Sequence, residues 1–365
     1  MDRSTVETAT IIEVAARAGV SKSTAARALA GYGSVSEKAR MAVRMAAEEL
    51  GYQPNALARS MITGRTMTLG VVIPDVSNHF FANAVRGIST AARESQYDVL
   101  LSSTEGDIGL ERRALDVLAS KRVDGVIVAP VSTEDTDHLE RLGARGVAVT
   151  LLDRPAPKVK EASYVAVDHV EASGLVVNHL IDLGHRRIGI LTALAAMAEQ
   201  PQEGTPENLR PSAARLFGYA QALRGAGIRY NPSYVGHSAY SRAAASEAAA
   251  RLLRENPELT ALYCTDNELS AGAFAALQDL EIDCPGRISL VGFDDQDWTT
   301  LVRPRLTVIE QPSYQLGMAA VQELLATIAG PGQRRRRKVL RGRLIIRDST
   351  ARPPIAAHPQ SGRIG

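Results

Sequence analysis

Residues 10–30, TIIEVAARAGVSKSTAARALA, set the architecture of the N-terminal part of the chain. The apolar spacing of residues 11–18 predicts a short helix that ends at Gly19. Ser21 is a typical N-cap, so we expect Lys22–Ala30 to form a second helix after one tight turn. Two short helices joined in this way indicate a helix-turn-helix.

A third helix is expected to brace this pair. It would begin at Ser36 and end at Gly51, with an apolar stripe formed by Ala39, Val43, Ala46 and Leu50. Residues 1–65 carry 9 Lys and Arg against 6 Asp and Glu, a net charge of +3, whereas the whole chain carries +2. A basic head on a nearly neutral body is typical of a protein that binds a polyanion.

The second helix carries side chains suited to reading DNA bases. Ser23 and Arg27 are four residues apart and share a helix face, with Lys22 beside them at the helix start. In the major groove, Lys and Arg can hydrogen-bond guanine, and Ser can bond several bases. These few residues leave one alternative open, a solvated face on an ordinary three-helix domain, because short motifs of this kind occur by chance.

From residue 66 onward, short apolar strands alternate with helices. Helices are expected at 80–96 and 110–120, and strands at 69–73, 97–101, 125–129, 147–152, 188–191, 261–264 and 288–293. Buried strands rich in Val, Ile and Leu predict parallel sheets with helices on both faces. This part is too long for one small domain, so we expect two α/β lobes facing a cleft, with ligand at the carboxyl ends of the strands.

The composition excludes several classes of protein. The chain has 365 residues, 45% hydrophobic and 22% charged, which fits neither a disordered nor a fibrous protein. We expect a cytoplasmic, nucleoid-associated protein with no membrane partner, since there is no long apolar run and early charges interrupt any signal peptide.

Cys264 and Cys284 are expected to be reduced thiols, and the basic run 334–338 to be a solvated loop. No nucleophile, phosphate-loop or metal-ligand motif occurs, so neither an enzyme nor a cofactor is expected.

Several motifs in a fixed order resemble the LacI/GalR family of bacterial transcription regulators. They are TI at 10–11, AGVS at 18–21, VSEKAR at 35–40, LGYQPNALARSM at 50–61, LGVVIPD at 69–75, SN at 77–78, LGHRRI at 183–188 and VGFDD at 291–295. Together they extend over about residues 10–350. The resemblance implies an all-α helix-turn-helix head and a hinge helix, joined to a two-lobed α/β core like that of periplasmic binding proteins.

The resemblance also implies domain boundaries. The head would span 10–53, the hinge helix and linker 54–66, and the effector-binding and dimerisation core 67–350. Within the core, lobe 1 would span about 67–165 and 307–330, and lobe 2 about 166–306 and 331–350. Residues 1–9 and 351–365 are expected to be disordered.

By the same resemblance, the head matches positions that contact DNA. Lys22, Ser23 and Arg27 match base-reading positions, and Thr10, Ser21, Thr24 and Asn55 match positions that contact phosphate or cap a helix. Hinge residues 55–61 would enter the minor groove as a pair, with contacts from Leu57, Ala58 and Met61. Met61 would be the apolar wedge, where leucine is usual in the family. Ala26 and Ala30 lack the polar groups common at their positions, so we expect a weaker or atypical operator contact.

The resemblance places a ligand between the lobes. Asp153, Arg215 and Asp294 are the principal candidates, with Asp75, Phe80, Thr265 and Gln311 beside them. Carboxylates can accept from paired hydroxyls and a guanidinium can bond two oxygens, which suits a sugar or polyol. Asp266 and Asp295 fit a turn or a helix cap equally well. His79, Thr265 and the segment 193–209 depart from the family pattern and leave the sugar unnamed.

These features predict a ligand-responsive transcriptional regulator. We expect a homodimeric repressor of sugar-utilisation genes on a pseudo-palindromic DNA operator, with the effector altering the packing of the hinge helices. An activator, or a regulator that responds to a non-sugar metabolite, is the alternative within the family. A sugar receptor would need an export signal and no DNA-binding head, and an enzyme would need a nucleophile or phosphate loop.

Overall fold

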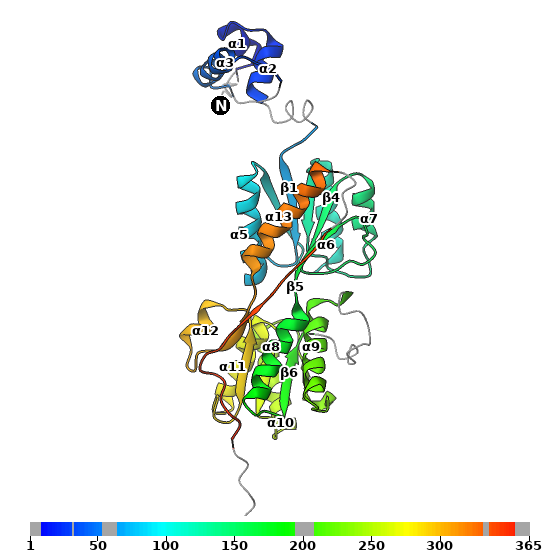
Figure 1. Cartoon of the computed structure of the whole chain (residues 1–365), viewed down its shortest axis with the longest axis vertical. Coiled ribbons are helices and arrows are strands. Elements are labelled where there is room, and N and C mark those ends of the chain that lie inside the picture. The colour runs from blue at the N-terminus through cyan, green and yellow to red at the C-terminus, as the bar shows by residue number, and fades with distance from the viewer. Residues whose placement is uncertain (1–8, 31–32, 53–63, 194–207, 331–335, 355–365) are drawn as a thin grey trace, which may run out of the picture. The chain divides into compact units, whose positions relative to one another are not determined.

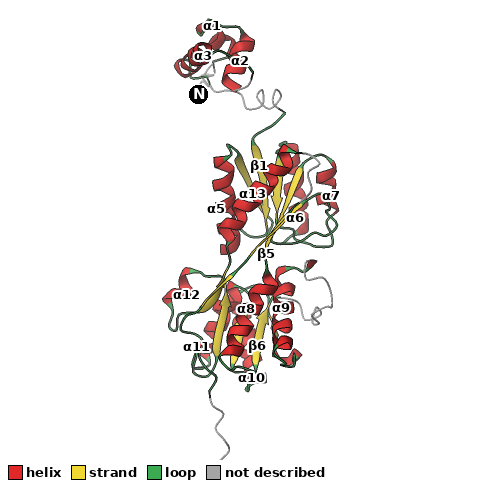
Figure 2. Ribbon diagram, in the orientation of Figure 1, coloured by secondary structure: helices red, strands yellow, loops and turns green. Residues whose placement is uncertain are grey.

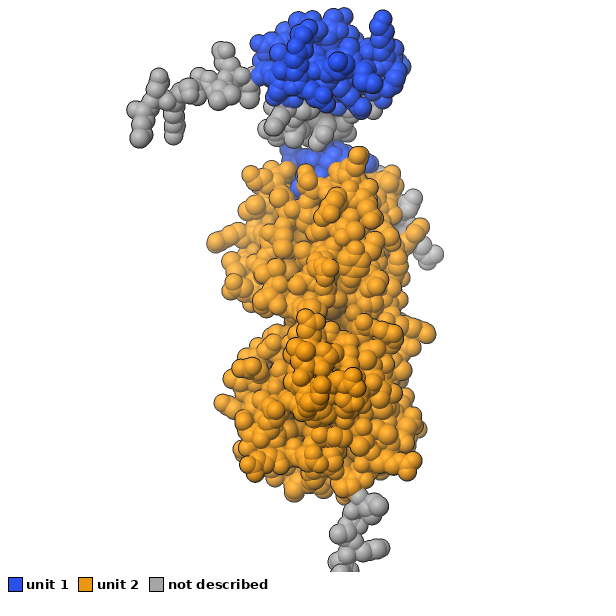
Figure 3. Space-filling view, turned by 90° about the vertical axis from the view of Figure 1, so that its left-hand side faces the viewer, with its two compact units in different colours: residues 1–68, 122–124 blue, residues 69–121, 125–365 orange. Residues whose placement is uncertain are grey.

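The computed structural model describes residues 9–30, 33–52, 64–193, 208–330 and 336–354. The chain divides into two compact units, shown in different colours in Figure 3. One unit comprises residues 1–68 with 122–124, and the other comprises residues 69–121 with 125–365. Of the predicted hinge, residues 54–63 lie outside the described residues.

The first unit contains the three predicted helices, α1 (Ile11–Arg17), α2 (Lys22–Ala30) and α3 (Glu37–Glu49) (Figure 2). Thr10 begins α1 with a capping box. Its hydroxyl accepts from the Glu13 amide at 3.4 Å, and its own amide donates to Glu13 Oε2 at 2.6 Å. Ser36 caps α3 through its hydroxyl. The helix-turn-helix predicted from the sequence is therefore confirmed.

Small side chains form the core of this unit. Its buried members are Val14, Ala15, Ala25, Ala28, Val43, Ala46 and Ala47. Gly19 ends α1 with a φ of +66°, in the left-handed region that glycine adopts without strain. The alanines of α2 therefore have different surroundings, because Ala25 and Ala28 are buried in the core whereas Ala26 is partly exposed.

The second unit consists of two α/β lobes (Figure 1). The sheet of the first lobe has the order β11-β5-β4-β3-β1-β2. Its strands are β1 (Thr68–Ile73), β2 (Asp98–Ser103), β3 (Gly125–Val128), β4 (Ala148–Leu152), β5 (Ser163–Val167) and β11 (Arg337–Leu340). The helices of this lobe are α5 (His79–Glu94), α6 (Ile108–Ser120), α7 (Asp137–Ala144) and α13 (Ser313–Ala329).

The sheet of the second lobe has the equivalent order β12-β10-β9-β8-β6-β7. Its strands are β6 (Ile188–Thr192), β7 (Val235–His237), β8 (Ala261–Cys264), β9 (Ser289–Phe293), β10 (Thr307–Glu310) and β12 (Arg343–Ile345). Its helical segments are α8 (His169–Asp182), α9 (Pro211–Gly225), η3 (Pro232–Tyr234), α10 (Arg242–Glu255), α11 (Asn267–Asp279) and α12 (Asp297–Leu301). Parallel pairing joins β7-β6-β8-β9-β10, as the apolar strands predicted.

The chain crosses between the lobes after β5, after β10 and after β11. Two of these crossings differ from the expected boundaries. Residues 307–310 were expected in lobe 1, but β10 pairs with β9 in the second sheet. Residues 331–350 were expected in lobe 2, but β11 pairs with β5 in the first sheet. Arg337 and Lys338 therefore lie in a strand, and the expected solvated loop over 334–338 is wrong for these two residues.

Strand β2 is an exception to the expected burial of the strands. Leu100 and Leu101 are each 41% exposed. The reason is that β2 forms one edge of its sheet, beside β1 only. The apolar sequence predicted the strand correctly but not its place in the sheet.

Other expectations concern isolated residues. Cys264 is buried, Cys284 is partly buried, and both are free thiols, as predicted. His185 is buried with both ring nitrogens bonded, Nδ1 to Thr260 Oγ1 and Nε2 to the Ala351 carbonyl, each at 2.9 Å. Within the described residues, no helix has both the length and the apolar character that a membrane crossing requires.

Candidate functional site

The start of α2 is a cluster of hydroxyl groups. Ser21 Oγ accepts from the Thr24 amide at 3.1 Å and lies 2.8 Å from Thr24 Oγ1 and 2.9 Å from Ser23 Oγ. Ser21, Lys22 and Ser23 are exposed. Because a helix N-terminus carries a partial positive charge, these exposed hydroxyls and the Lys22 ammonium form a polar surface that would favour an anion.

Arg27 lies one turn further along the same helix. Its Nε donates to the Ser23 carbonyl at 3.3 Å, and its Cδ would be 3.2 Å from a Cβ placed on Gly33. Within the described residues it forms no ion pair, so the guanidinium is available to a ligand. Thr10 is engaged in the cap of α1. The other predicted DNA contacts, Asn55, Leu57, Ala58 and Met61, lie outside the described residues.

A cavity of about 260 Å³ lies between the two lobes of the second unit. Five of the seven predicted effector residues line it, namely Phe80, Asp153, Arg215, Asp294 and Gln311. The remaining lining residues are Asn78, Phe81, Arg154, Ala193, Arg210, Pro211, Ser212, Tyr240 and Asp266. Its volume is slightly below the roughly 300–1,000 Å³ of drug-sized pockets, which suits a small polar metabolite.

Asp153 and Asp294 occupy equivalent places at the ends of two strands. Asp153 follows β4 with a φ of +63°, and Asp294 follows β9 with a φ of +71°. Each backbone amide bonds the neighbouring strand at 2.8 Å, to the carbonyls of Val165 and Ile309. Aspartate tolerates this left-handed conformation better than most residues, and strained positions of this kind cluster at functional sites.

Arg215, from the first turns of α9, connects the groups around the cavity. It is only 7% exposed, and its Nη1 donates to the Thr265 carbonyl at 2.6 Å. Its guanidinium stacks on Phe293, 3.9 Å from the ring centroid. Its Nε donates to His169 Nδ1 at 3.3 Å, and His169 Nε2 lies 3.0 Å from Asp153 Oδ1. These contacts link the second lobe to the carboxylate of the first.

The two strand-end carboxylates have opposite electrostatics. Burial raises the pKa of Asp294, and the nearby Arg215 only partly offsets this effect. Burial would also raise the pKa of Asp153, but the contact with His169 and the charges of Arg215 and Arg154 outweigh it and lower the pKa. Burial and Arg215 lower the pKa of His169, so the imidazole is neutral near pH 7 and its Nε2 donates to Asp153.

The remaining predicted acidic residues have different roles. Asp75 does not line the cavity, because its Oδ1 accepts from the amide and hydroxyl of Ser77, each at 2.7 Å, in a local turn. Asp266 both caps α11 and lines the cavity, and burial raises its pKa to about 6. Asp295 pairs with Arg347 at 2.6 Å outside the cavity. Thr265 contributes its backbone carbonyl to Arg215 rather than lining the cavity with its side chain.

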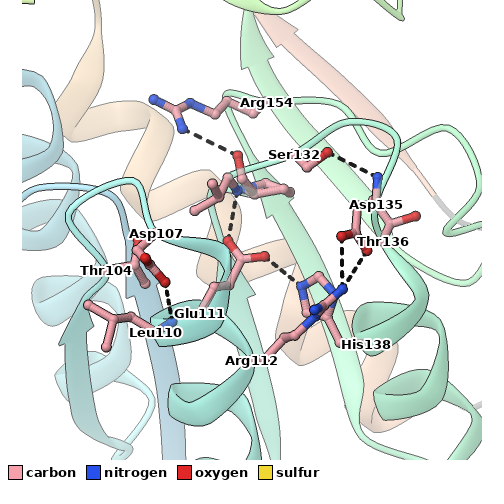
Figure 4. Close-up of polar contacts among 12 residues, drawn as sticks. Thr104, Asp107, Leu110, Glu111, Arg112, Ser132, Asp135, Thr136, His138 and Arg154 are labelled. Atoms are coloured by element: carbon pink, nitrogen blue, oxygen red, sulfur yellow. Dashed lines mark hydrogen bonds and ion pairs between the residues drawn. The ribbon is translucent and has the colours of Figure 1, made fainter.

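Arg154 and Arg210 were not assigned from the sequence, although Arg154 follows Asp153 directly. Arg154 Nη1 donates to the Pro130 carbonyl at 3.3 Å (Figure 4). The adjacent Val131 amide donates to Glu111 Oε2 at 2.7 Å, and Glu111 Oε1 lies 2.6 Å from His138 Nε2. This buried network fixes the loop that holds Arg154.

Asn78 and Tyr240 were also not assigned. Asn78 Oδ1 caps α5 by accepting from the Phe80 amide at 2.9 Å. Its Nδ2 donates to Tyr240 Oη of the second lobe at 2.6 Å. One asparagine therefore orients a helix in the first lobe and bonds the second lobe at the margin of the cavity.

A larger cavity of about 790 Å³ lies along α8 and α9. Its acidic side chains are already engaged, because Asp168 caps α8 and Glu171 pairs with Arg341. Fewer uncommitted polar groups converge there than between the lobes. The smaller cavity is therefore the better candidate for a specific polar ligand.

Comparisons with known proteins agree with this architecture. Residues 10–55 match the model of bacterial regulatory proteins of the lacI family, and residues 177–350 match that of the periplasmic binding protein-like domain. The catabolite control protein A of Priestia megaterium is 32% identical, over 86% of this chain and 91% of that protein. The chain belongs to the LacI family.

Two further transcriptional regulators illustrate the match. The transcriptional repressor CytR of Escherichia coli K12 is 30% identical, over 95% of this chain and 97% of that protein. The solved complex of the transcriptional regulator CelR with cellobiose has 27% identity and a TM-score of 0.69, over 93% of this chain and 99% of that one. This chain is thus a DNA-binding transcriptional regulator rather than an enzyme.

Proposed function

We propose that this chain represses transcription by binding a pseudo-palindromic operator as a homodimer, and that a sugar or sugar derivative between the lobes changes its operator affinity. One observation carries the proposal. A helix-turn-helix with an exposed polar helix start occurs in the same chain as a two-lobed cavity lined by carboxylates and arginines. The likeness to the CelR–cellobiose complex supports a carbohydrate effector.

On the DNA side, Lys22, Ser23 and Arg27 read bases, while Thr10, Ser21 and Thr24 hold the phosphate backbone. Asn55, Leu57, Ala58 and Met61 act in the minor groove. One short helix reads only a few base pairs, so specificity requires two copies on two half-sites. In this assignment the head is residues 10–53, the hinge 54–66, and the remainder up to residue 350 the effector-binding core.

The exposed edge of the first lobe is the proposed dimer interface. Leu100 and Leu101 on β2 are half-exposed, as are Leu110 and Val117 of the adjacent α6. A long apolar edge strand is an aggregation hazard unless another chain covers it. A second copy, related by a two-fold axis, would bury these side chains and place two heads on one operator.

On the effector side, Asp153, Asp294 and Gln311 accept and donate to hydroxyls, and Arg215 orients them. A ligand that contacts both lobes favours the arrangement in which they are close together. That preference is coupled to operator affinity through the segment that joins the core to the head.

The first test is selection of operator sequences. Genomic fragments retained by the purified chain at near-physiological salt should be enriched in a short palindrome. Binding of that palindrome and of a scrambled duplex is then compared for wild type, Arg27→Ala and Arg44→Ala. Arg44 is an exposed cation on α3 and serves as the matched control.

Arg27→Ala should weaken operator binding about 10- to 100-fold, the effect of one base contact worth roughly 1–3 kcal/mol, with little change on scrambled DNA. Arg44→Ala should change both affinities slightly and equally. Operator affinity that is unaffected by Arg27→Ala would show that α2 does not read the bases.

A further inference from the structure

Two arginine side chains line one end of the cavity between the lobes. Arg154 and Arg210 both line the cavity, and neither forms an ion pair with any described carboxylate. Burial and the positive charge of Arg210 together lower the pKa of Arg154 to about 10, although the charges of Asp153 and Glu111 act in the opposite direction. Burial also lowers the pKa of Arg210. Arg154 is half-buried and Arg210 is exposed, and the two charges repel each other, so an anion that binds between them would relieve this repulsion.

The carboxylates nearby are committed to other groups. Asp153 accepts from His169 at 3.0 Å, and Glu111 accepts from the Val131 amide at 2.7 Å and contacts His138 at 2.6 Å. Figure 4 shows the two Glu111 oxygens bonded to the Val131 amide and to His138, while Arg154 bonds the Pro130 carbonyl. Asp153 and Glu111 favour the charge of Arg154 without bonding it, so within the described residues no carboxylate forms an ion pair with either arginine.

The amino end of α9 adds uncharged donors at the same place. Arg210 is the N-cap of this helix, Pro211 is its first residue, and no side chain caps it. The amides of Ser212 and Ala213 lie in the first turn, where no helical carbonyl is available to them. Pro211 and Ser212 line the cavity with Arg210. The positive end of the dipole of this 15-residue helix therefore lies at the cavity.

A separate observation points to a ligand with hydroxyl groups in the same cavity. Gln311 is 8% exposed, and its Nε2 donates to Asp294 Oδ1 at 2.6 Å. Its Oε1 is buried without a partner among the described residues. A buried unpaired acceptor is costly, so a ligand hydroxyl at this position would satisfy it.

We propose that the effector is an anionic sugar, a sugar phosphate or a sugar acid. Its anionic group binds between Arg154 and Arg210 at the start of α9, and its hydroxyls face Asp153, Asp294 and Gln311. This inference rests on the proposed effector-binding function and makes it more specific. Arg154 is held in advance by the Pro130 carbonyl, so little reorganisation is needed when the anion binds.

Thermal unfolding of the full chain in sodium phosphate, against sodium chloride at equal ionic strength, tests the anion subsite directly. Phosphate should raise the Tm of wild type by several degrees more than chloride does. Arg210→Gln should lose that increment, and Arg210→Lys should keep part of it because the charge is retained. Arg224→Gln, in the exposed last turn of the same helix, is the matched control and should respond like wild type.

Without phosphate, the sign of the effect distinguishes a binding arginine from a structural one. Arg210→Gln should raise the Tm of the ligand-free chain, because it removes a charge that repels Arg154. A lower Tm, or a phosphate response equal to that of wild type, would overturn the inference.

Calorimetric titration with matched compounds identifies the anion. The compounds are D-glucose, D-glucose 6-phosphate and D-gluconate, and D-ribose with D-ribose 5-phosphate. At least one anionic member should bind 10-fold or more tightly than its neutral partner, and only in chains that retain Arg210. Tighter binding of the phosphates assigns a phosphate site, whereas tighter binding of gluconate assigns a carboxylate site.

Neutral sugars that bind as tightly as their anionic partners, and that shift operator affinity, would overturn this inference while leaving the proposed function intact. Failure of the operator selection would instead remove the proposed function without altering the phosphate response of the cavity. The two failures are therefore distinguishable.

Discussion

The two lobes have the same strand order but treat equivalent carboxylates differently. Asp153 and Asp294 follow the corresponding strands β4 and β9, and both have a left-handed backbone. In the first lobe the aspartate accepts from a histidine at 3.0 Å. In the second lobe it accepts from Gln311, a neutral amide, at 2.6 Å. Both partners are uncharged, and the ionised form of Asp153 is favoured further by the charges of Arg215 and Arg154, whereas for Asp294 burial outweighs the charge of Arg215.

The difference follows from where each partner lies in the chain. His169 begins α8 immediately after the crossing from β5, so it belongs to the second lobe but bonds the first. Gln311 follows β10 at the second crossing. Each crossing segment thus carries a side chain to a strand-end aspartate. The contact with His169 and the charges of Arg215 and Arg154 lower the pKa of Asp153, whereas Arg215 and Gln311 only partly offset the burial that raises the pKa of Asp294.

The edges of the sheets differ as well. Strand β2 has six residues with exposed leucines, whereas its counterpart β7 has only three residues. A long apolar edge invites pairing and a short one does not. The same topology thus provides an apolar edge suited to dimerisation in one lobe only.

The largest expected effect is from Arg215→Met, which removes the cation that both lobes share. Three carboxylates, those of Asp153, Asp266 and Asp294, would lose a favourable charge. Removing one partner of a buried charged cluster costs roughly 3–5 kcal/mol. Urea unfolding should show this loss in the free energy of unfolding, and effector binding should be abolished. A loss below about 1 kcal/mol would mean that stacking on Phe293, which methionine partly preserves, is the main role of Arg215.

The comparison between lobes is tested most directly by Asp153→Asn and Asp294→Asn. Asparagine accepts the same backbone conformation, so only the charge changes. Asp153→Asn should reduce the free energy of unfolding at pH 7 by about 2–3 kcal/mol, because a charged hydrogen bond is lost. Asp294→Asn should be neutral or slightly stabilising, because its ionised form is disfavoured by burial. Equal losses in urea unfolding would contradict the inferred asymmetry.

The sequence predicted where the strands lie in the chain better than it predicted which strands pair with one another. Runs such as the one in β1 and in β9 are apolar over their whole length, and this local property determines a buried strand. Which sheet receives β10 or β11 depends on contacts with distant strands, so the expected crossings were misplaced. The exposure of Leu100 has the same cause, since an edge position is set by the sheet and not by the strand.

The residues of the cavity between the lobes likewise fall into those that the sequence predicted and those that it did not. Asp153 and Asp294 were predicted because the resemblance to the LacI/GalR family places a ligand at these positions, each at the end of an apolar strand. The resemblance placed no ligand at Arg210, and Asn78 and Tyr240 are 162 residues apart in the chain. No local sequence pattern indicates that Asn78 and Tyr240 contact each other. Unpaired charge and cross-lobe bonds become visible only when the fold brings the residues together.

A smaller effect is expected from the pH dependence of stability. The pKa of Asp266 is raised from 3.8 to about 6, mainly by burial. Between about pH 4 and pH 6 the folded chain therefore binds a proton that the unfolded chain lacks, so this group adds stability as the pH falls. Asp266 should contribute about 1 kcal/mol more at pH 5 than at pH 7. Asp266→Asn, which preserves the cap of α11, should remove that increment from the unfolding free energy.

The asparagine variant also separates this effect from the other titrating groups. Wild type and variant share every other group, so only their difference is interpreted. A difference that does not change between pH 5 and pH 7 would contradict the raised pKa. A difference of opposite sign would place Asp266 with Asp153, as a carboxylate stabilised in its ionised form.

The smallest expected effect is from Tyr240→Phe, which removes one hydrogen bond between the lobes. Asn78 Nδ2 donates to Tyr240 Oη at 2.6 Å, while the Asn78 cap of α5 is independent of it. A neutral hydrogen bond contributes about 1 kcal/mol, so effector affinity should fall roughly 5-fold if the bond favours the arrangement that binds ligand. Titration calorimetry with any bound effector measures this change.

Tyr234→Phe is the matched control, because its hydroxyl donates to Glu258 at 2.8 Å within the second lobe only. It should leave effector affinity unchanged. If both variants bind equally, the Asn78–Tyr240 bond does not distinguish the ligand-bound arrangement. If the Tyr240→Phe variant instead binds the effector more tightly, the Asn78–Tyr240 bond must favour an arrangement of the lobes that binds the effector weakly. The charges that line the cavity would then be what brings the lobes together around the effector.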